Sequence, residues 1–304
     1  MIRRLLLASA LSLASFLAVP AVAAPPGFAF LEVPVGARAS AMGGAYAAVA
    51  KGAEAAFWNP AGLLGTERTE ISGTHYEWIE SLRQDQFVLA GQLFGGGVAA
   101  SLRSLYSEPI EQRDELGNLI GTFGSHDLQF GLGYGFDLGG GLSGGVSGQF
   151  VRERLAELSA DTWGVDMGAA FAPESWGGVR AALAIQNLGP AAQYTLDGVP
   201  GRDVGLPLAL HGGVSASRGL GTLTLLGALD SRLTVGRPGV VALGAELASP
   251  IGASLRAGLR MNDDLATASF GVGYAARAYA VDYAFVPSKL DLADTHRFSF
   301  SARF

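Results

Sequence analysis

From about Glu67 to its last residue, the chain consists of short segments in which bulky apolar residues alternate with small or polar ones. In the last segment, Phe298, Phe300, Ala302 and Phe304 lie on one face, and the positions between them are Arg or Ser. A period of two is that of a β-strand. The same alternation appears in four further segments, 127–136, 162–171, 254–261 and 279–285.

The composition of the two faces distinguishes between two kinds of β-protein. A secreted β-sandwich also alternates, because one face of each strand is buried. Here the apolar face carries Phe, Tyr, Trp and Leu, often near strand ends, and the opposite face carries Gly, Ser, Asp, Gln and Arg. A transmembrane barrel has such an exterior, with aromatic girdles, and a polar lumen. The pattern therefore favours an all-β, transmembrane antiparallel β-barrel.

The number of strands follows from the same pattern. Fourteen segments are candidates: 68–79, 84–94, 97–107, 126–137, 142–154, 160–172, 178–188, 205–217, 221–231, 238–248, 252–261, 266–275, 277–286 and 295–304. Each strand with its connection takes about 17 residues, and a tilted membrane strand needs about 9–11. With an even number of strands, the barrel segment begins and ends on the same side of the membrane, which is the periplasmic side. Counts of twelve or sixteen stay open, and the connections at 108–121 and 187–202 are expected to be extracellular loops.

The first 23 residues have the layout of a secretory signal peptide. Arg3 and Arg4 precede an apolar run over 5–18, and an Ala-Val-Ala triplet at 21–23 follows Pro20. The alternative is an N-terminal membrane helix, but the run is short for spanning and an Ala-x-Ala site closes it. The later chain has no apolar run near the ~18 residues that a membrane helix needs. We therefore expect an exported protein of the bacterial outer membrane.

Composition excludes several kinds of site. The chain has no cysteine and only four widely scattered histidines, so a metal centre has little to build on. A net charge of −6 argues against a nucleic-acid partner. His126 and Asp127 are adjacent on a strand and therefore face opposite ways, which prevents them from acting as a hydrolytic dyad. We expect no enzymatic activity, no cofactor and no metal.

Before the strands, residues 24–66 form a block of small residues that a barrel has to accommodate. Its Ala-rich stretches favour short helical turns, and Gly43-Gly44, Gly52 and Asn59-Pro60 interrupt them. The result expected is a compact, bent hatch, or plug, ahead of a barrel over 67–304. Whether such a hatch moves or is fixed stays open.

Two motifs in this block carry a family resemblance: GARASAMGGAY at 36–46 and AAFWNPAGL at 55–63. Together they resemble the N-terminal signature of the PorV/PorQ family, which belongs to the FadL-like outer-membrane barrels, the long-chain fatty acid transporter superfamily. The resemblance implies a fourteen-stranded barrel with the N-terminal segment folded inside as a hatch. Asn59, Pro60 and Ala61 would lie within that hatch.

The hatch contains the candidate gate and ligand residues. Asn59 tolerates unusual backbone angles and Pro60 stops a helix, so together with Ala61 they form either a displaceable gate or an ordinary turn. Gly43 and Gly44 complete the candidate gate. Four apolar residues are candidates either for contact with an apolar ligand or for packing against the wall: Met42, Tyr46, Phe57 and Trp58. A further candidate, Arg38, would bind a carboxylate head group or pair with luminal acidic residues.

Three functions are consistent with such a barrel. The first is a passive conduit for hydrophobic molecules such as long-chain fatty acids. The second is a PorV-like role in type IX protein secretion, in which the barrel receives exported cargo from secretion-system proteins. The third is a surface scaffold. Other expected partners are outer-membrane lipid and the barrel assembly machinery, which would read Phe298, Phe300 and the terminal Phe304.

Overall fold

The computed structural model describes residues 27–77, 82–196, 198–264, 266–289 and 293–304. The predicted signal peptide over 1–23 lies outside the described residues. In the described part of the chain, no helix is long and apolar enough to cross a membrane.

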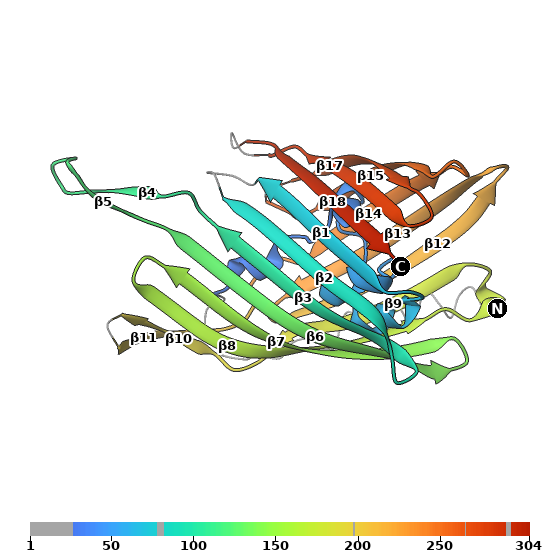
Figure 1. Ribbon diagram of the computed structural model, residues 1–304, viewed down its shortest axis with the longest axis horizontal. Coiled ribbons are helices and arrows are strands. Elements are labelled where there is room, and N and C mark those ends of the chain that lie inside the picture. Colours follow the sequence, from blue (N-terminus) through green and yellow to red (C-terminus); the bar gives the residue numbers. More distant parts are fainter. Residues whose placement is uncertain (1–26, 78–81, 197, 265, 290–292) are drawn as a thin grey trace.

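Fourteen antiparallel strands form a closed barrel (Figure 1). They are β1 (Glu70–Glu77), β2 (Arg83–Leu93), β3 (Gly96–Tyr106), β6 (Ser125–Gly139), β7 (Leu142–Leu155), β8 (Leu158–Phe171), β9 (Val179–Leu188), β12 (Ala209–Leu220), β13 (Leu223–Thr234), β14 (Val240–Ala248), β15 (Ala253–Met261), β16 (Ala268–Ala275), β17 (Tyr279–Val286) and β18 (Thr295–Arg303). Each pairs with its neighbour in the sequence of wall strands, and β1 pairs with β18. The predicted count of fourteen is confirmed, and each predicted strand coincides with one of these.

The strands present their bulky side chains outward, as the alternation predicts. Phe298, Phe300 and Trp163 are each about half exposed. The residues at alternate positions, such as Arg297 and Asp166, are buried in the interior. An apolar exterior over a polar lumen is the arrangement that a lipid bilayer requires. The fold is therefore a transmembrane barrel rather than a sandwich.

The two ends of the barrel differ in the length of their connections. At one end, which we call the turn end, strands are joined by short turns, and the Phe304 N–H donates to Thr69 O (2.9 Å). The other end, the loop end, carries the long connections. Two of these form hairpins, β4 (Ile110–Arg113) with β5 (Leu119–Phe123) and β10 (Ala192–Leu196) with β11 (Val199–Val204).

The two hairpins lie in the long connections expected at these positions and add strand pairing that the sequence pattern does not predict. In β4–β5, the Asp114 carboxylate accepts backbone N–H groups of Leu116 and Asn118 (2.9 and 2.8 Å). Gly117 provides the left-handed residue that follows, at φ +83°. The residues of this turn thus allow β4 and β5 to pair, although the apolar pattern of the two segments is too irregular to indicate strands.

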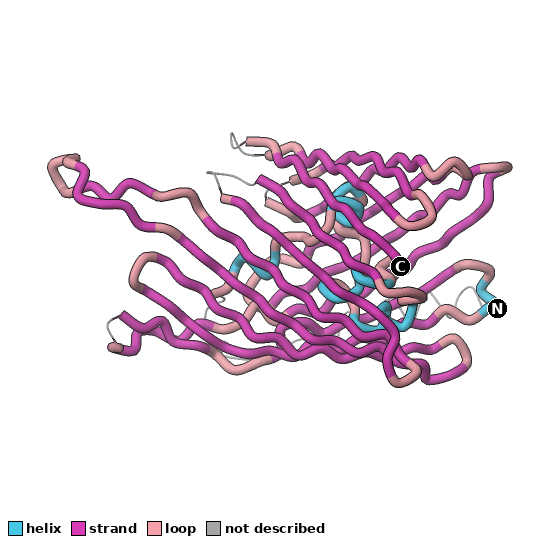
Figure 2. Tube along the Cα trace, viewed as in Figure 1, coloured by secondary structure: helices cyan, strands magenta, loops and turns pink. Residues whose placement is uncertain are grey.

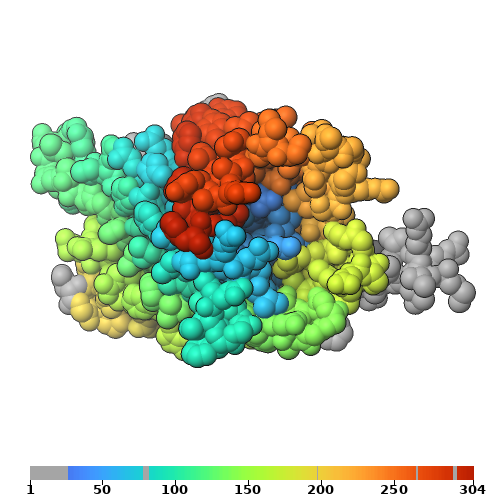
Figure 3. Space-filling model, turned by 45° about the vertical axis from the view of Figure 1, so that its right-hand side comes forward, coloured from blue at the N-terminus to red at the C-terminus, as the bar shows by residue number. Residues whose placement is uncertain are grey.

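Residues 27–66 lie inside the barrel as the predicted hatch (Figure 2). Its short helices are η2 (Ala29–Glu32), α2 (Ala37–Ala41), η3 (Gly52–Phe57) and η4 (Pro60–Gly65). A further 3-10 turn, η6 (Glu174–Trp176), lies in the β8–β9 connection. With the turn end brought forward, atoms of the hatch are visible between the strands (Figure 3).

Candidate functional site

A groove of wall glycines holds the last helix of the hatch. Gly97 of β3, Gly135 of β6 and Gly145 of β7 face η4, and a Cβ at any of them would overlap hatch backbone. At Gly97 the overlap is with the Leu63 carbonyl, and at Gly145 it is with the backbone that leaves Pro60. We call these three residues the first glycine cradle. Only glycine permits the two backbones to approach so closely.

A second glycine cradle lies on β14 and β15. A Cβ at Gly244 or Gly258 would overlap Met42 or the backbone of Gly43. Gly43 itself has a left-handed backbone (φ +67°), and its carbonyl accepts a hydrogen bond from Arg260 Nε (2.7 Å). The predicted gate residue Gly43 is therefore a docking point of the hatch on the wall.

The side chain of Asn59 bridges the neighbouring wall strands β8 and β9. Its Nδ2 donates to Ala169 O on β8 (3.2 Å) and to Leu183 O on β9 (3.5 Å). Its Oδ1 accepts the Ala61 N–H (3.0 Å) and caps η4. At Gly168 a Cβ would overlap Oδ1.

The backbone of Asn59 differs from the expected unusual conformation. Its angles, φ −158° and ψ 107°, are those of extended chain. Pro60 takes the first helical position of η4, where its missing N–H has no cost. Asn59 and Pro60 therefore start a helix at the wall, and the side chain of Asn59 supplies the contact.

A buried carboxylate on β13 fixes the middle of the hatch. Asp230 Oδ2 accepts the backbone N–H groups of Tyr46 (2.7 Å) and Ala47 (2.6 Å). His211 Nε2 on β12 lies 3.0 Å from the same oxygen. Asp230 and His211 are only 2% and 3% exposed, so these bonds are shielded from bulk water.

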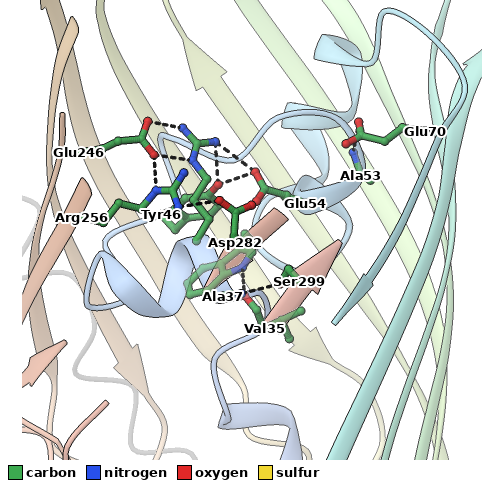
Figure 4. Close-up of polar contacts among 12 residues, drawn as sticks. Val35, Ala37, Tyr46, Ala53, Glu54, Glu70, Glu246, Arg256, Asp282 and Ser299 are labelled. Atoms are coloured by element: carbon green, nitrogen blue, oxygen red, sulfur yellow. Dashed lines mark hydrogen bonds and ion pairs between the residues drawn. The ribbon is translucent and has the colours of Figure 1, made fainter. Parts of the chain in front are cut away.

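On the turn side of the hatch, charged side chains form a network (Figure 4). Arg38 binds both carboxylate oxygens of Glu246 on β14 (2.8 Å each) and also donates to Tyr46 Oη and Glu54 (3.0 and 3.3 Å). Arg256 on β15 donates to the same Glu246 (2.5 Å). Of the two roles expected for Arg38, this geometry corresponds to pairing with acidic residues.

The phenol of Tyr46 belongs to the same network. It donates to Glu54 Oε2 at 2.5 Å. Burial raises the pKa of Tyr46 well above its usual value; Arg38 opposes this shift and the Glu54 carboxylate adds to it. Tyr46 therefore stays protonated and acts as a donor that ties η3 to the first half of the hatch.

The lumen contains a cavity on each side of the hatch. A loop-side cavity of about 330 Å³ is lined by Val33, Pro34 and Trp58 of the hatch. A turn-side cavity of about 340 Å³ is lined by Val35 and Gly36 together with Trp58. The segment 32–36 and the Trp58 indole thus form the partition between them.

Trp58 is held in the partition by three contacts. Its Nε1 donates to Val35 O (3.1 Å). Its ring lies edge-on to Tyr46, with centroids 5.5 Å apart, and 5.6 Å from the ring of His211. Of the five ligand candidates in the hatch, Trp58 is the one that lines both cavities.

We expect Trp58→Ala to connect the two cavities and raise single-channel conductance in planar bilayers several-fold, because the indole is the widest group in the partition. Trp163→Ala is the matched control, since Trp163 lies on the outer face of β8 and is 58% exposed. An unchanged conductance for Trp58→Ala, in a protein that assembles normally, would show that the indole does not limit passage.

The remaining candidates pack against the wall or face outward. Met42 is fully buried between the hatch and Gly244, and the Phe57 ring lies beneath the Arg103 guanidinium (4.8 Å). Both contacts correspond to the packing alternative. Residues Phe298, Phe300 and Phe304 are exposed on the outer face, and their role in barrel assembly stays a prediction.

Sequence reasoning did not identify Asp230, His211 or the glycine cradles. A partial signal for the cradles existed, since Gly131, Gly133 and Gly135 occupy alternate positions on the luminal face of β6. No signal in the sequence connects Asp230 with residues 46 and 47, because the contact joins positions about 180 residues apart.

Comparison with known proteins identifies the fold. No protein-family model matches the chain, and no curated protein does either. Three similar solved structures are the CymD monoaromatic hydrocarbon channel (TM-score 0.60, 14% identity, covering 90% of this chain and 98% of that one), the Ralstonia pickettii toluene transporter TbuX (0.59, 16%, 89% and 98%) and a Pseudomonas aeruginosa FadL homologue (0.55, 13%, 90% and 98%). At these identities the likeness establishes a shared barrel fold.

Proposed function

We propose that this protein is a passive conduit of the bacterial outer membrane for hydrophobic molecules. The observation that carries the proposal is the divided lumen: a hatch anchored to the wall separates a loop-side from a turn-side cavity, and Trp58 and the segment 32–36 are the partition. The shared fold with channels described as carrying toluene and other monoaromatic hydrocarbons supports it. We place the loop end at the cell exterior, because an even strand count leaves the first and last strands with their termini on the periplasmic side.

An apolar cluster in the loop half of the barrel supports a hydrophobic cargo. The hatch residues Phe28, Phe30 and Leu31 belong to it, together with wall residues such as Leu105 and Val151. Phe28 is fully buried. This part of the lumen thus encloses phenyl rings of the chain itself in apolar surroundings of the kind that hydrophobic ligands prefer.

The test is uptake in a deletion strain. We expect cells lacking the protein to take up toluene and oleate several-fold more slowly, and expect recovery with the wild-type gene. An immunoblot of the outer membrane confirms that the complemented strain contains the barrel at the wild-type level. Equal uptake of both probes with and without the protein would overturn the proposal.

We further propose that the protein belongs to the PorV/PorQ branch, which the motifs at 36–46 and 55–63 indicate. That branch would add a role in type IX secretion, with function in the extracellular connections instead of the lumen. Co-purification of a secretion translocon, combined with unchanged uptake of toluene and oleate, is the result that would favour secretion.

A further inference from the structure

Three arginines, one buried and two half-buried, surround the loop-side cavity. Arg232 of β13, Arg260 of β15 and Arg297 of β18 all line it. Arg297 is only 3% exposed. Placing three guanidinium groups around one enclosed space is costly unless anions balance them.

The acidic residues of the cavity balance only part of this charge. Glu32 pairs with a further arginine, Arg237 (2.8 Å), and Asp263 pairs with Arg260 (3.3 Å). Asp230 is occupied by His211 and the hatch backbone. A last acidic residue, Asp264, is exposed. Among the residues that the structure describes, Arg232 and Arg297 form no ion pair with a carboxylate.

The two unpaired arginines have hydrogen-bonding capacity left. Arg297 uses Nη1 for Pro34 O (2.8 Å) and Ser40 Oγ (2.7 Å), and Arg232 has one long contact from Nη1 to Glu32 O (3.5 Å). Within the described residues, Nη2 of each has no hydrogen-bond partner, and neither Nη2 is among the atoms sealed from solvent. These Nη2 groups are therefore available to a molecule in the cavity.

The rest of the lining favours a compact apolar body. Trp58 forms part of the cavity surface beside the His211 ring, and Val33, Val240 and Val286 contribute aliphatic surface. A volume of about 330 Å³ lies at the lower end of the range of ligand pockets, about 300–1,000 Å³.

We propose that the loop-side cavity binds a small aromatic carboxylate, with the carboxylate between Arg232 and Arg297 and the ring against Trp58. This inference rests on the proposed function and deepens it, because it names an anionic substrate class for the entrance of a hydrophobic conduit. Charge-assisted hydrogen bonds from guanidinium to carboxylate are among the strongest that a protein offers, so the anion binds more tightly than a neutral ring of the same size.

The test compares benzoate with benzyl alcohol by isothermal titration of the full-length, detergent-solubilised protein. We expect benzoate to bind at least about tenfold more tightly than the alcohol. Arg232→Met should lower benzoate affinity about tenfold or more and leave benzyl alcohol affinity unchanged. If Arg232→Met does not assemble, Arg232→Gln makes the same test, because it removes the charge and retains a donor for Glu32 O.

Arg152→Met is the matched control, since it removes the same charge from an exposed arginine that pairs with Asp161 (2.6 Å) away from the cavity. Equal benzoate affinity in wild type and Arg232→Met would overturn the proposal. So would inorganic phosphate binding as tightly as benzoate, because the apolar lining would then have no role. Toluene uptake separates the two proposals: if toluene enters and benzoate does not bind selectively, the conduit stands and the carboxylate site fails.

Discussion

Gly145→Val is expected to displace the hatch from the barrel wall and make the outer membrane permeable to large antibiotics. The backbone that leaves Pro60 occupies the space that a Cβ at position 145 would take. The contacts at Gly97 and Gly135 hold η4 equally close to the neighbouring strands β3 and β6, so the helix has little room to shift. Overpacking at one site costs about 1–3 kcal/mol of stability. Because the Cβ at position 145 would overlap backbone, we expect a cost at or above the upper end of that range.

The measurement is vancomycin sensitivity of cells that carry matched barrel levels, with the unfolding temperature of the purified barrel as a second readout. Gly148→Val is the control: it lies on the same strand, and a Cβ there meets no atom within 4 Å. We expect it to change stability by no more than about 0.5 kcal/mol. Equal behaviour of the two variants would show that the cradle does not hold the hatch.

The barrel was predictable from the sequence because a membrane strand imposes a local rule. Phe298 and Phe300 face lipid and Arg297 faces the lumen, whatever the neighbouring strands contain. The same applies to the hatch breaks: Gly43 and Gly44 adopt left-handed angles (φ +67° and +78°) and end α2. Strand count, facing and the helical interruptions all follow from residues close in sequence.

The contacts inside the lumen were not predictable in the same way. Arg38 has several luminal carboxylates to choose from, and only the packed structure selects Glu246 and Glu54. Luminal glycines are visible in the sequence, but which of them touch the hatch depends on its position. Gly145 contacts backbone, whereas Gly148 on the same strand faces outward.

The placement of the two glycine cradles bears on whether the hatch moves. In the order of strands around the barrel, β6 and β7 lie opposite β14 and β15. Close backbone contacts therefore hold η4 against one wall and Met42-Gly43 against the other. Displacing the whole hatch would break both sets of contacts together, so the structure favours a hatch that is fixed at these points.

Asp230, which anchors the hatch between the two cradles, should be as sensitive to substitution as Gly145. Asp230→Ala is expected to release the turn at Tyr46 and Ala47, because it leaves two buried backbone N–H groups without an acceptor. Each unsatisfied group costs about 1–3 kcal/mol. A local loss of about 3 kcal/mol corresponds to amide hydrogen exchange roughly 100-fold faster. Hydrogen exchange measured by mass spectrometry, on peptides that cover 44–50, provides the readout.

Two further variants determine how that result is interpreted. Asp230→Asn keeps one oxygen acceptor and should therefore give a smaller increase in exchange. Asp203→Ala removes a carboxylate from the exposed β11 hairpin, where it accepts a hydrogen bond from Gln193 (2.6 Å), and should leave the hatch peptides unchanged. If Asp230→Ala also leaves their exchange unchanged, the other hatch contacts hold this turn, and the carboxylate serves mainly as a partner of His211 in the wall of the loop-side cavity.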